Sequence, residues 1–254
     1  ARLRPTYAMP LPSDTHLPLN GIRVVEFTHM VMGPTCGMAL GDMGADVIKV
    51  EPLTGDSTRR LLGSGAGFYP LFNRNKKSLA LDLQSVRGRE VVLRLIATAD
   101  IVSENFKAGT MKKLGLDYET LKKLNPRLIY VSLKGFLPGP YEHRTALDEV
   151  VQMMGGLAYM TGRPGDPLRA GASVNDIMGG MFGAMGAMAA LAQRTQTGLG
   201  QEVQSALFEN NVLLVAQHML QYQVTGKAAE PMPARISAWA IYDVFEVKTA
   251  NTYF

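Results

Sequence analysis

The residue of this sequence with the clearest chemical potential is Asp176. In the stretch ASVNDIMGGMFG, residues 172–183, it is a single carboxylate that precedes a run of glycine and methionine. In the first turn of a helix, the positive end of the helix dipole would stabilise the ionised carboxylate by about 0.3–1 kcal/mol. Such a carboxylate can cap the helix, or it can attack a substrate as a nucleophile. The pattern of residues alone favours the cap.

The segment after Asp176 predicts one long helix, residues 176–198, that ends at Gly198. Glycines at positions 179, 183 and 186 form one stripe along this helix, which would let a neighbouring backbone approach closely. Methionines at positions 178, 181, 185 and 188 form a second stripe, which we interpret as core filling.

Cationic residues recur in small groups at the edges of the predicted strands. The groups are Arg59 and Arg60, then Arg74, Lys76 and Lys77, then Lys112 and Lys113. Each group by itself is typical of a solvated surface. Together they could hold several phosphate groups of a ligand.

Several common ligand motifs are missing from the sequence. The first predicted strand is not followed by G-x-G-x-x-G, and the glycines there, at positions 33, 37, 41 and 44, lie on one helix face and indicate close packing. There is no P-loop and no G-x-S-x-G elbow, and the 4 histidines are scattered rather than spaced as zinc ligands. We therefore expect no metal, no nicotinamide and no flavin.

The elements that must position these residues alternate between strands and helices. Short apolar runs rich in β-branched residues predict strands at 21–27, 45–51, 78–83, 100–106 and 128–133. A turn at 33–37, helices near 38–44, 85–100 and 112–125, and a glycine-rich loop at 52–70 connect them. This alternation predicts an α/β fold, with a parallel sheet covered by helices on both faces.

The second half of the chain is predicted to be mostly helical. Long helices are expected at 176–198 and 204–226, and a strand at 240–248 begins a new unit. We divide the chain into a flexible tail (1–18), a large ligand-binding α/β domain (19–226), and a linker with the beginning of a second, smaller domain (227–254). The chain therefore looks truncated.

Composition limits the class of protein. Of the 254 residues, 46% are hydrophobic and 19% charged, which predicts a substantial core. The net charge of +4 is too small for a nucleic-acid binder but suits a small anionic ligand. The single cysteine, Cys36, excludes an internal disulfide, and no run approaches ~20 apolar residues. We expect a soluble cytoplasmic protein that binds neither nucleic acid nor a membrane.

Four stretches in this order resemble the class III CoA-transferases, a family that includes formyl-CoA and carnitine CoA-transferases and the α-methylacyl-CoA racemases. The stretches are GIRVVEFTHMVMGPTCGMALGDMGADVIKVEPLTGDSTR, NRNKKSLALDL, ENFKAGTMKKLGLDYETLKKLNPRLIYVSLKGF and ALDEVVQMMGG. The resemblance implies a Rossmann-like large domain, a smaller second domain that is mostly missing here, and an interlocked homodimer.

The resemblance also implies a role for Asp176. In the transferases an Asp before a glycine-containing helix attacks an acyl-CoA thioester, and CoA then resides on that Asp as an aspartyl-CoA thioester until a carboxylic acid takes it. Asp176 in VNDIMGG matches this Asp. The expected activity is therefore that of an acyl-CoA:carboxylate CoA-transferase, with coenzyme A entering as part of the substrate. Such chemistry needs a site that excludes water.

By the same resemblance, eight residues should lie along bound CoA. They are His29, Met30 and Val31, then Leu81 and Gln84, then Asn105, Phe106 and Lys113. One departure is Pro52, which replaces an arginine near the adenine of formyl-CoA transferase. Arg59 or Arg74 could supply that contact instead.

A second departure lies in the expected substrate pocket, at Leu147 and Asp148. The racemases have a histidine at the first of these positions, as one half of an acid/base pair. Because Leu147 cannot transfer protons, a racemase interpretation loses its base and a transferase interpretation loses one substrate contact. Asp148 is expected to support the site. An α-methylacyl-CoA racemase or isomerase, or a non-catalytic CoA-binding subunit, remains the alternative.

Overall fold

The computed structural model describes residues 17–237 and 239, and its centre is a parallel sheet of 6 strands. The strands are β1 (Arg23–Phe27), β2 (Asp46–Glu51), β3 (Lys76–Ala80), β4 (Ile101–Glu104), β5 (Ile129–Lys134) and β6 (Glu202–Ala206). Runs such as RVVEF and IYVSLK form strands because their apolar residues are buried on both faces of the sheet. The predicted strand at 240–248 and most of the predicted tail lie outside the described residues.

The strand order is β3-β2-β1-β4-β5-β6, and every neighbouring pair is parallel. From β1 the chain builds one half of the sheet through β2 and β3. It then crosses back to β4, which lies beside β1, and builds the other half through β5 and β6. In sheets of this kind the crevice at the carboxyl ends of β1 and β4 is the usual place for a ligand. The segments that follow β1 and β4 are therefore the ones to inspect.

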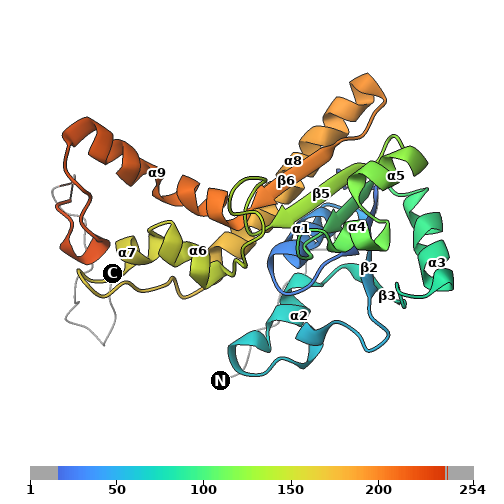
Figure 1. Ribbon diagram of the computed structural model, residues 1–254, viewed down its shortest axis with the longest axis horizontal. Helices are drawn as coiled ribbons and strands as arrows, with labels where there is room; N and C mark the ends of the chain where they lie inside the picture. Colours follow the sequence, from blue (N-terminus) through green and yellow to red (C-terminus); the bar gives the residue numbers. More distant parts are fainter. Residues whose placement is uncertain (1–16, 238, 240–254) are drawn as a thin grey trace, which may run out of the picture.

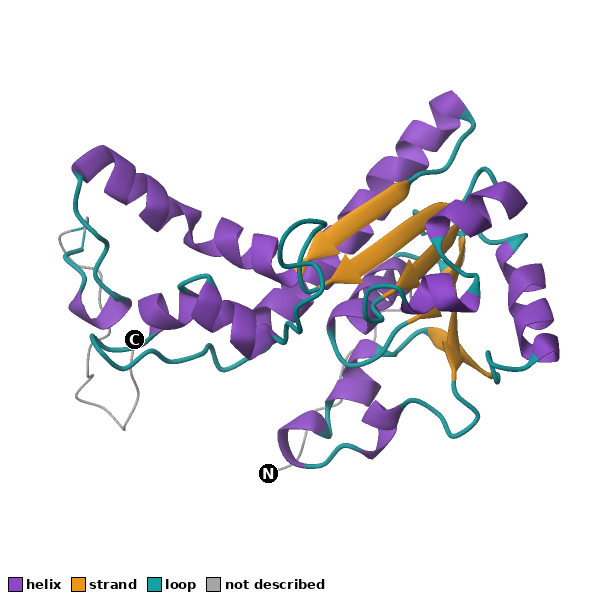
Figure 2. Ribbon diagram, viewed as in Figure 1, coloured by secondary structure: helices purple, strands orange, loops and turns teal. Residues whose placement is uncertain are grey.

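Helices cover both faces of the sheet (Figures 1 and 2). On one face α1 (Met32–Asp42) and α8 (Val174–Thr197) bury a cluster that includes Val24, Cys36 and Ala187. On the other face α3 (Val86–Ile96), α4 (Thr110–Leu114) and α5 (Tyr118–Leu124) cover a second cluster around Phe27 and Ile96. The predicted α/β architecture is confirmed.

Three further helices extend away from the sheet (Figure 1). They are α6 (Asp148–Met154), α7 (Leu157–Thr161) and α9 (Leu207–Thr225), and the short α2 (Phe68–Phe72) follows two 3-10 turns in the glycine-rich loop. Within the described residues, none of the helices has the length and apolar content needed to cross a bilayer.

Strand β6 was not predicted, because residues 204–206 were assigned to the helix at 204–226 and residues 202–203 to no element. The helix begins directly at Leu207, one residue after Ala206 ends the strand. No turn residue separates the two elements, so the sequence carries no signal for the change. Only the backbone pairing of Tyr130–Lys134 with Glu202–Ala206 defines this edge of the sheet.

Two helix predictions are also corrected. Helix α1 begins at Met32, so the segment GPTCG is helical rather than a turn. The helix predicted at 112–125 is two helices, because Gly115 adopts a left-handed conformation (φ 69°) and Asp117 caps a new start through the backbone N–H of Thr120.

The prediction that the methionine stripe of α8 fills the core is wrong for Met181 and Met185, which are 48% and 57% exposed, whereas Met188 packs against the core. The glycine stripe faces the sheet instead. A Cβ on Gly183 would lie 2.7 Å from Leu133, and one on Gly186 would lie 2.5 Å from Val203. Helix α8 therefore lies so close to β5 and β6 that only very small residues fit on its inner face.

Candidate active site

Asp176 lies in the first turn of α8, partly buried, beside the first turn of α1. Its carboxylate accepts a hydrogen bond from the backbone N–H of Met32. The pKa of Asp176 is raised to about 7, mainly by burial and then by the Asp148 and Glu149 carboxylates, while the bond from the Met32 amide lowers it. The group therefore changes its charge near neutral pH, which is common among residues that do chemistry.

The cap of α8 comes from another helix. Ser173, at the N-cap position, makes no side-chain capping bond. Instead Asp148 Oδ1 accepts the backbone N–H groups of Asn175 (2.8 Å) and Asp176 (3.1 Å). Asp148 is the first residue of α6 and is 4% exposed. The two candidate roles of Asp176 thus separate, because Asp148 caps the helix and the Asp176 side chain is not used as the cap.

Amide side chains hold Asp148 and the start of α8 from behind. The Gln152 side chain donates to Asp148 Oδ2 and accepts the backbone N–H of Ala170 (2.8 Å). Asn175 donates to Asn211 of α9 (3.3 Å), which in turn donates to the Val151 carbonyl (3.0 Å). Sequence reasoning missed this amide layer, although the spacing of Asp148 and Gln152, one helical turn apart, was a usable signal.

Helices α1 and α8 touch where the two first turns meet. A Cβ on Gly180 would lie 2.5 Å from the Met32 carbonyl oxygen and 2.5 Å from Thr35 Cβ. This contact requires glycine, and it explains why the Met32 amide can reach Asp176. The glycines of this segment thus belong to the geometry of the site.

The segments after β1 and β4 are bound to each other. Asn105 accepts the His29 backbone N–H (2.9 Å) and donates to the His29 carbonyl (2.8 Å). The rings of His29 and Phe106 stack with their centroids 5.9 Å apart. Met30 adopts a left-handed backbone (φ 62°), which is unusual for a residue with a side chain. Three residues predicted from separate stretches of sequence thus form one cluster.

The other residues predicted to contact CoA lie at the same edge of the sheet. Val31 is the buried N-cap residue of α1, and Leu81 and Gln84 follow the carboxyl end of β3. Lys113 is exposed on α4, which follows β4. Leu147 is 57% exposed at the start of α6, next to Asp148. Because all strands are parallel, their carboxyl ends share one edge, and these residues follow strands at that edge.

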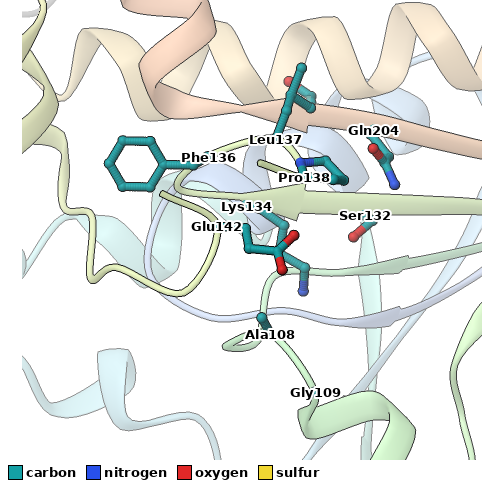
Figure 3. Close-up of a pocket in the computed structure, with 10 residues that line it drawn as sticks. Ala108, Gly109, Ser132, Lys134, Phe136, Leu137, Pro138, Glu142 and Gln204 are labelled. Carbon is teal, nitrogen blue, oxygen red and sulfur yellow. The ribbon is translucent and has the colours of Figure 1, made fainter. Parts of the chain in front are cut away.

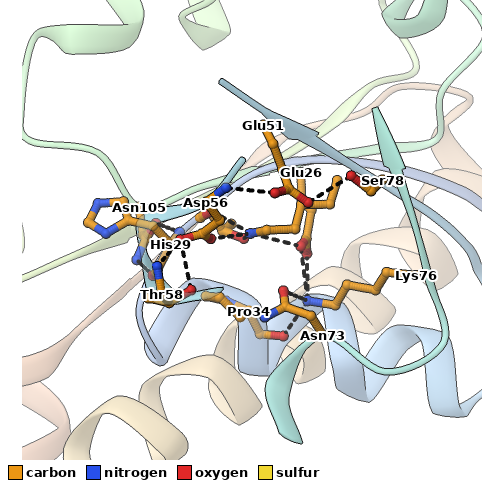
Figure 4. Close-up of polar contacts among 12 residues, drawn as sticks. Glu26, His29, Pro34, Glu51, Asp56, Thr58, Asn73, Lys76, Ser78 and Asn105 are labelled. Carbon is orange, nitrogen blue, oxygen red and sulfur yellow. Dashed lines mark hydrogen bonds and ion pairs between the residues drawn. The ribbon is translucent and has the colours of Figure 1, made fainter. Parts of the chain in front are cut away.

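A buried network of charges supports this edge (Figure 4). The Lys49 ammonium, 1% exposed, lies 3.0 Å from Asp56 Oδ2 and 3.7 Å from Glu26 Oε1 and donates to the Thr28 carbonyl at 2.5 Å. Lys76 donates to Glu26 (2.9 Å) and to the Pro34 carbonyl (2.8 Å). These bonds anchor the chain on both sides of the cluster that contains His29 and Met30.

Arg59 and Arg74, either of which could replace the arginine missing at Pro52, lie at opposite edges of the sheet. Arg74 precedes β3 and pairs with Asp42 at the end of α1 (2.5 Å), which is the amino edge of the sheet. Arg59 pairs with Glu51 (2.7 Å) at the carboxyl end of β2, and its guanidinium lies 3.9 Å from the centre of the Tyr69 ring. Of the two, only Arg59 lies at the edge where the site residues gather.

The predicted groups of lysines also differ in whether their charges are free to bind a phosphate. Lys77 pairs with Asp46 at the amino edge (2.5 Å), and Lys76 is held by Glu26 in the interior. The triplet at 74–77 therefore does not offer free charges to a phosphate. Lys112 and Lys113, both exposed on α4, remain placed for that role.

A separate small pocket of about 190 Å³ opens at the carboxyl ends of β5 and β6 (Figure 3). Ser132, Lys134, Phe136, Glu142 and Gln204 are among its lining residues. None of the predicted site residues lines it. The Lys134 ammonium already pairs with Glu104 (2.6 Å) and donates to the Phe106 carbonyl (2.6 Å). The pocket therefore adjoins Phe106, although Asp176 does not line it. In the part of the chain that the structure describes, no cluster of three or more His, Cys, Asp or Glu side chains could hold a metal ion.

Comparison with known sequences assigns the chain to a family. The sequence model described as CoA-transferase family III matches residues 19–253. The chain belongs to CoA-transferase family III. The resemblance seen in the four sequence stretches is thereby confirmed for almost the whole chain.

Members of CoA-transferase family III with curated names are similar to this chain at about 40% identity. The succinate–glutarate CoA-transferase of Agrobacterium fabrum is 41% identical over 223 residues, which covers 83% of this chain and 56% of the relative. A formyl-CoA:oxalate CoA-transferase of Rhodopseudomonas palustris is 42% identical over 211 residues, covering 81% of this chain and 49% of the relative. The chain spans about half the length of these curated relatives.

A solved structure has the same fold. The crystal structure of a CAIB/BAIF family protein from Brucella suis superposes with a TM-score of 0.87 at 39% sequence identity, covering 94% of this chain and 65% of that one. The Rossmann-like parallel sheet flanked by helices is therefore shared with a relative.

Proposed function

We propose that the protein is an acyl-CoA:carboxylate CoA-transferase in which Asp176 carries CoA as a covalent aspartyl-CoA thioester. The observation that carries this proposal is the environment of Asp176, a partly buried carboxyl group that accepts the Met32 amide while its capping function is taken by Asp148. A carboxylate with a pKa near 7 is a stronger nucleophile than an ordinary aspartate and is still largely ionised above neutral pH.

In the first half-reaction, an oxygen of the Asp176 carboxylate attacks the thioester carbonyl of the donor acyl-CoA. The carbon–sulfur bond breaks and leaves an acyl–aspartyl mixed anhydride and a CoA thiolate. The thiolate then attacks the Asp176 carbonyl carbon, which releases the donor acid as a carboxylate and forms the aspartyl-CoA thioester. Burial at the start of α8 protects both species from water.

In the second half-reaction, the acceptor carboxylate attacks the aspartyl thioester and displaces the CoA thiolate. The thiolate attacks the acceptor carbonyl of the new anhydride, which forms the product acyl-CoA and restores the Asp176 carboxylate. The exchange is balanced without a redox step. The Met32 N–H, which already donates to Asp176, is placed to donate to the oxygen that gains charge in each tetrahedral intermediate.

We infer that CoA lies along the carboxyl edge of the sheet, against the cluster of His29, Asn105 and Phe106. The exposed Lys112 and Lys113 on α4 are cations of this edge that can face its phosphates, and Arg59 after β2, whose guanidinium is paired with Glu51, lies nearby. The two relatives named above act, by their names, on the dicarboxylic acids succinate, glutarate and oxalate. A dicarboxylic acid is therefore the proposed acceptor, and succinyl-CoA the donor to test first.

We also propose that the functional unit is a homodimer. Helices α6, α8 and α9 expose large apolar side chains, including Met153, Met181, Leu213 and Leu220, at 48% or more. Large apolar side chains exposed on several helices are typical of an interaction surface, and a second copy of the chain is the proposed occupant.

The decisive experiment for the covalent step is to trap it. The full-length protein is incubated with succinyl-CoA and hydroxylamine, digested and analysed by mass spectrometry. We expect a hydroxamate on the peptide that contains Asp176, and none in the sample without acyl-CoA or in Asp176→Asn. A hydroxamate at a different residue, or none at all in an active enzyme, would exclude the proposed intermediate.

The alternative activities give different outcomes. An α-methylacyl-CoA racemase or isomerase would exchange the substrate α-proton with deuterated water in the absence of any acceptor acid. A non-catalytic subunit would bind CoA equally well in Asp176→Ala and transfer nothing in its natural form. Transfer from succinyl-CoA to members of a panel of dicarboxylic and hydroxy acids, without α-proton exchange, is the result expected here.

A further inference from the structure

We propose that Asp148 is the positioning residue of this site, and that its carboxylate sets both the direction of Asp176 and the charge that Asp176 bears at neutral pH. The inference rests on the proposed role of Asp176 as the nucleophile. It goes further because it proposes that the nucleophile is controlled by a residue that does not touch the substrate.

The geometry around Asp148 supports a role in positioning and argues against contact with the substrate. Its Oδ1 is occupied by the N–H groups of Asn175 and Asp176, and its Oδ2 by the Gln152 side chain. At 4% exposure, the carboxylate has no face left for a substrate. The Asp148 carboxylate lies close enough to Asp176 to raise the pKa of that group.

The hydrogen bond from the Asp176 N–H to Asp148 fixes the backbone position of the proposed nucleophile. Because Ser173 provides no side-chain cap, the first N–H groups of α8 depend on Asp148 for a partner. The backbone of Asp176 is thus tied to α6, while its side chain is tied to α1 through Met32. Three helices converge on one residue, which restricts the direction in which its carboxylate can point.

The second effect of Asp148 is electrostatic. Two carboxylates in neighbouring positions oppose each other's ionisation, and Asp176, which has one donor where Asp148 has three, is the one whose pKa is raised. The same residue therefore holds Asp176 in place and makes its carboxylate more basic. A neutral cap such as Ser or Asn would achieve the first effect without the second.

The other charged groups on the elements around Asp176 are either exposed or paired, or they lie farther away. From α6, Glu149 also faces it, but that side chain is 49% exposed and pairs with Arg169 of the preceding loop. Helix α1 contributes the Met32 amide, and its one carboxylate, Asp42, lies at its far end. From α9, Glu209 accepts the Leu137 backbone N–H at 3.2 Å. The remaining charged groups of the loop before α8 are Arg163 and Asp166, both exposed.

The test is Asp148→Asn, which retains an oxygen for the two N–H groups of α8 and removes the charge. We expect the acid limb of the pH profile of kcat/KM to move down by about one pH unit. Asp176 should titrate at lower pH in the same variant, as read from the 13C resonance of its side-chain carboxyl, identified by its loss in Asp176→Asn. The matched control is Glu149→Gln, which removes a neighbouring but solvated charge and should move both readouts much less.

A second variant guards against loss of folding. In Asp148→Asn with Gln152→Glu, the amide and the carboxylate change places, so the hydrogen bonds of the cluster persist while the charge moves one turn away from α8. Asp176 should again titrate at lower pH. A titration that is unchanged in both variants would overturn the inference, because it would leave Asp148 as a structural cap only.

The two proposals can fail separately. The carboxyl titration needs no turnover, so a shift in a protein without transferase activity would refute the proposed function and retain the control of Asp176 by Asp148. Normal transferase activity with an acid limb and a titration that do not move in Asp148→Asn would refute the positioning role alone.

Discussion

The ionised form of Asp176 lowers the stability of the folded protein. Its pKa in the fold is about 7, whereas an aspartate in an unfolded chain has a pKa of about 3.9. Between these two values the unfolded state has already released the proton and the folded state still holds it. Stability contributed by this group is therefore fully present below pH 4 and is lost as the pH rises through 7.

This sign leads to a prediction for Asp176→Asn. The variant should unfold with nearly the same free energy as the natural protein near pH 4 and be more stable above pH 7, by at most about 4 kcal/mol, from the 1.36 kcal/mol that each pKa unit represents. Urea unfolding at a series of pH values measures this difference. Asp166→Asn, at an exposed position, is the control with no such trend. A stability difference for Asp176→Asn that is independent of pH would contradict the assignment.

Lys49 provides a second residue-scale prediction, because its charge is enclosed by Asp56 and Glu26. Lys49→Met should lower the free energy of unfolding by about 3–5 kcal/mol, since it leaves the buried Asp56 without a counter-charge and Glu26 with Lys76 alone. Lys77→Met is the matched control. It breaks an ion pair whose lysine is 72% exposed, and it should cost no more than about 1 kcal/mol. Equal losses in the two variants would show that Lys49 does not hold the interior together.

At the scale of elements, the site depends on the contact between α1 and α8. Gly180→Ala would place a Cβ 2.5 Å from the Met32 carbonyl oxygen, so the two helices must separate. We expect a loss of about 1–3 kcal/mol of stability, as for other overpacked sites, and a fall of about tenfold to a hundredfold in kcat because the Met32 amide moves away from Asp176.

Calorimetry and steady-state kinetics of the same preparation measure both effects of Gly180→Ala. The control is Gly67→Ala, at a position with an ordinary helical backbone (φ −83°) and no atom within 4 Å of the added Cβ. If Gly180→Ala retained full kcat, the close crossing of α1 and α8 would have no part in catalysis.

At the scale of the whole molecule, the sheet-bearing part is covered on both faces, whereas the helices that extend from it are not (Figure 1). On α9, Leu213, Leu220 and Val224 share one helix face and are 58%, 64% and 84% exposed. A monomer would leave this stripe in water. The proposed second copy would cover it.

The corresponding prediction concerns mass in solution. Sedimentation equilibrium of the full-length protein should give twice the mass of one chain, and Leu213→Glu with Leu220→Glu should shift the population toward one chain. Val86→Glu, on α3 and 65% exposed, should leave the mass unchanged. A doubly substituted protein that remains dimeric would place the interface elsewhere.

Much of the fold could be predicted from the sequence, because parallel strands buried on both faces are continuous apolar runs. The runs near 21–27, 45–51 and 128–133 read in this way, and each is a strand. Once the strands are known to be parallel, their carboxyl ends must share one edge. His29, Asn105 and Phe106 were predicted from the resemblance to the class III CoA-transferases, and this rule explains why they meet; the place of Asp176 in the first turn of a helix was predicted from the helical segment 176–198.

The features that could not be predicted from the sequence are contacts between segments that lie far apart along the chain. Strand β6 exists only because Glu202–Ala206 find an unpaired edge on β5, and the exposure of Met185 follows from glycine facing the sheet. Asp148 acts on Asp176 from 28 positions earlier in the chain, a relation that no local pattern records. The residue types and the edge at which they meet are thus properties of the sequence. The ionisation and direction of Asp176 are decided by tertiary structure, because burial and a neighbouring charge act through space.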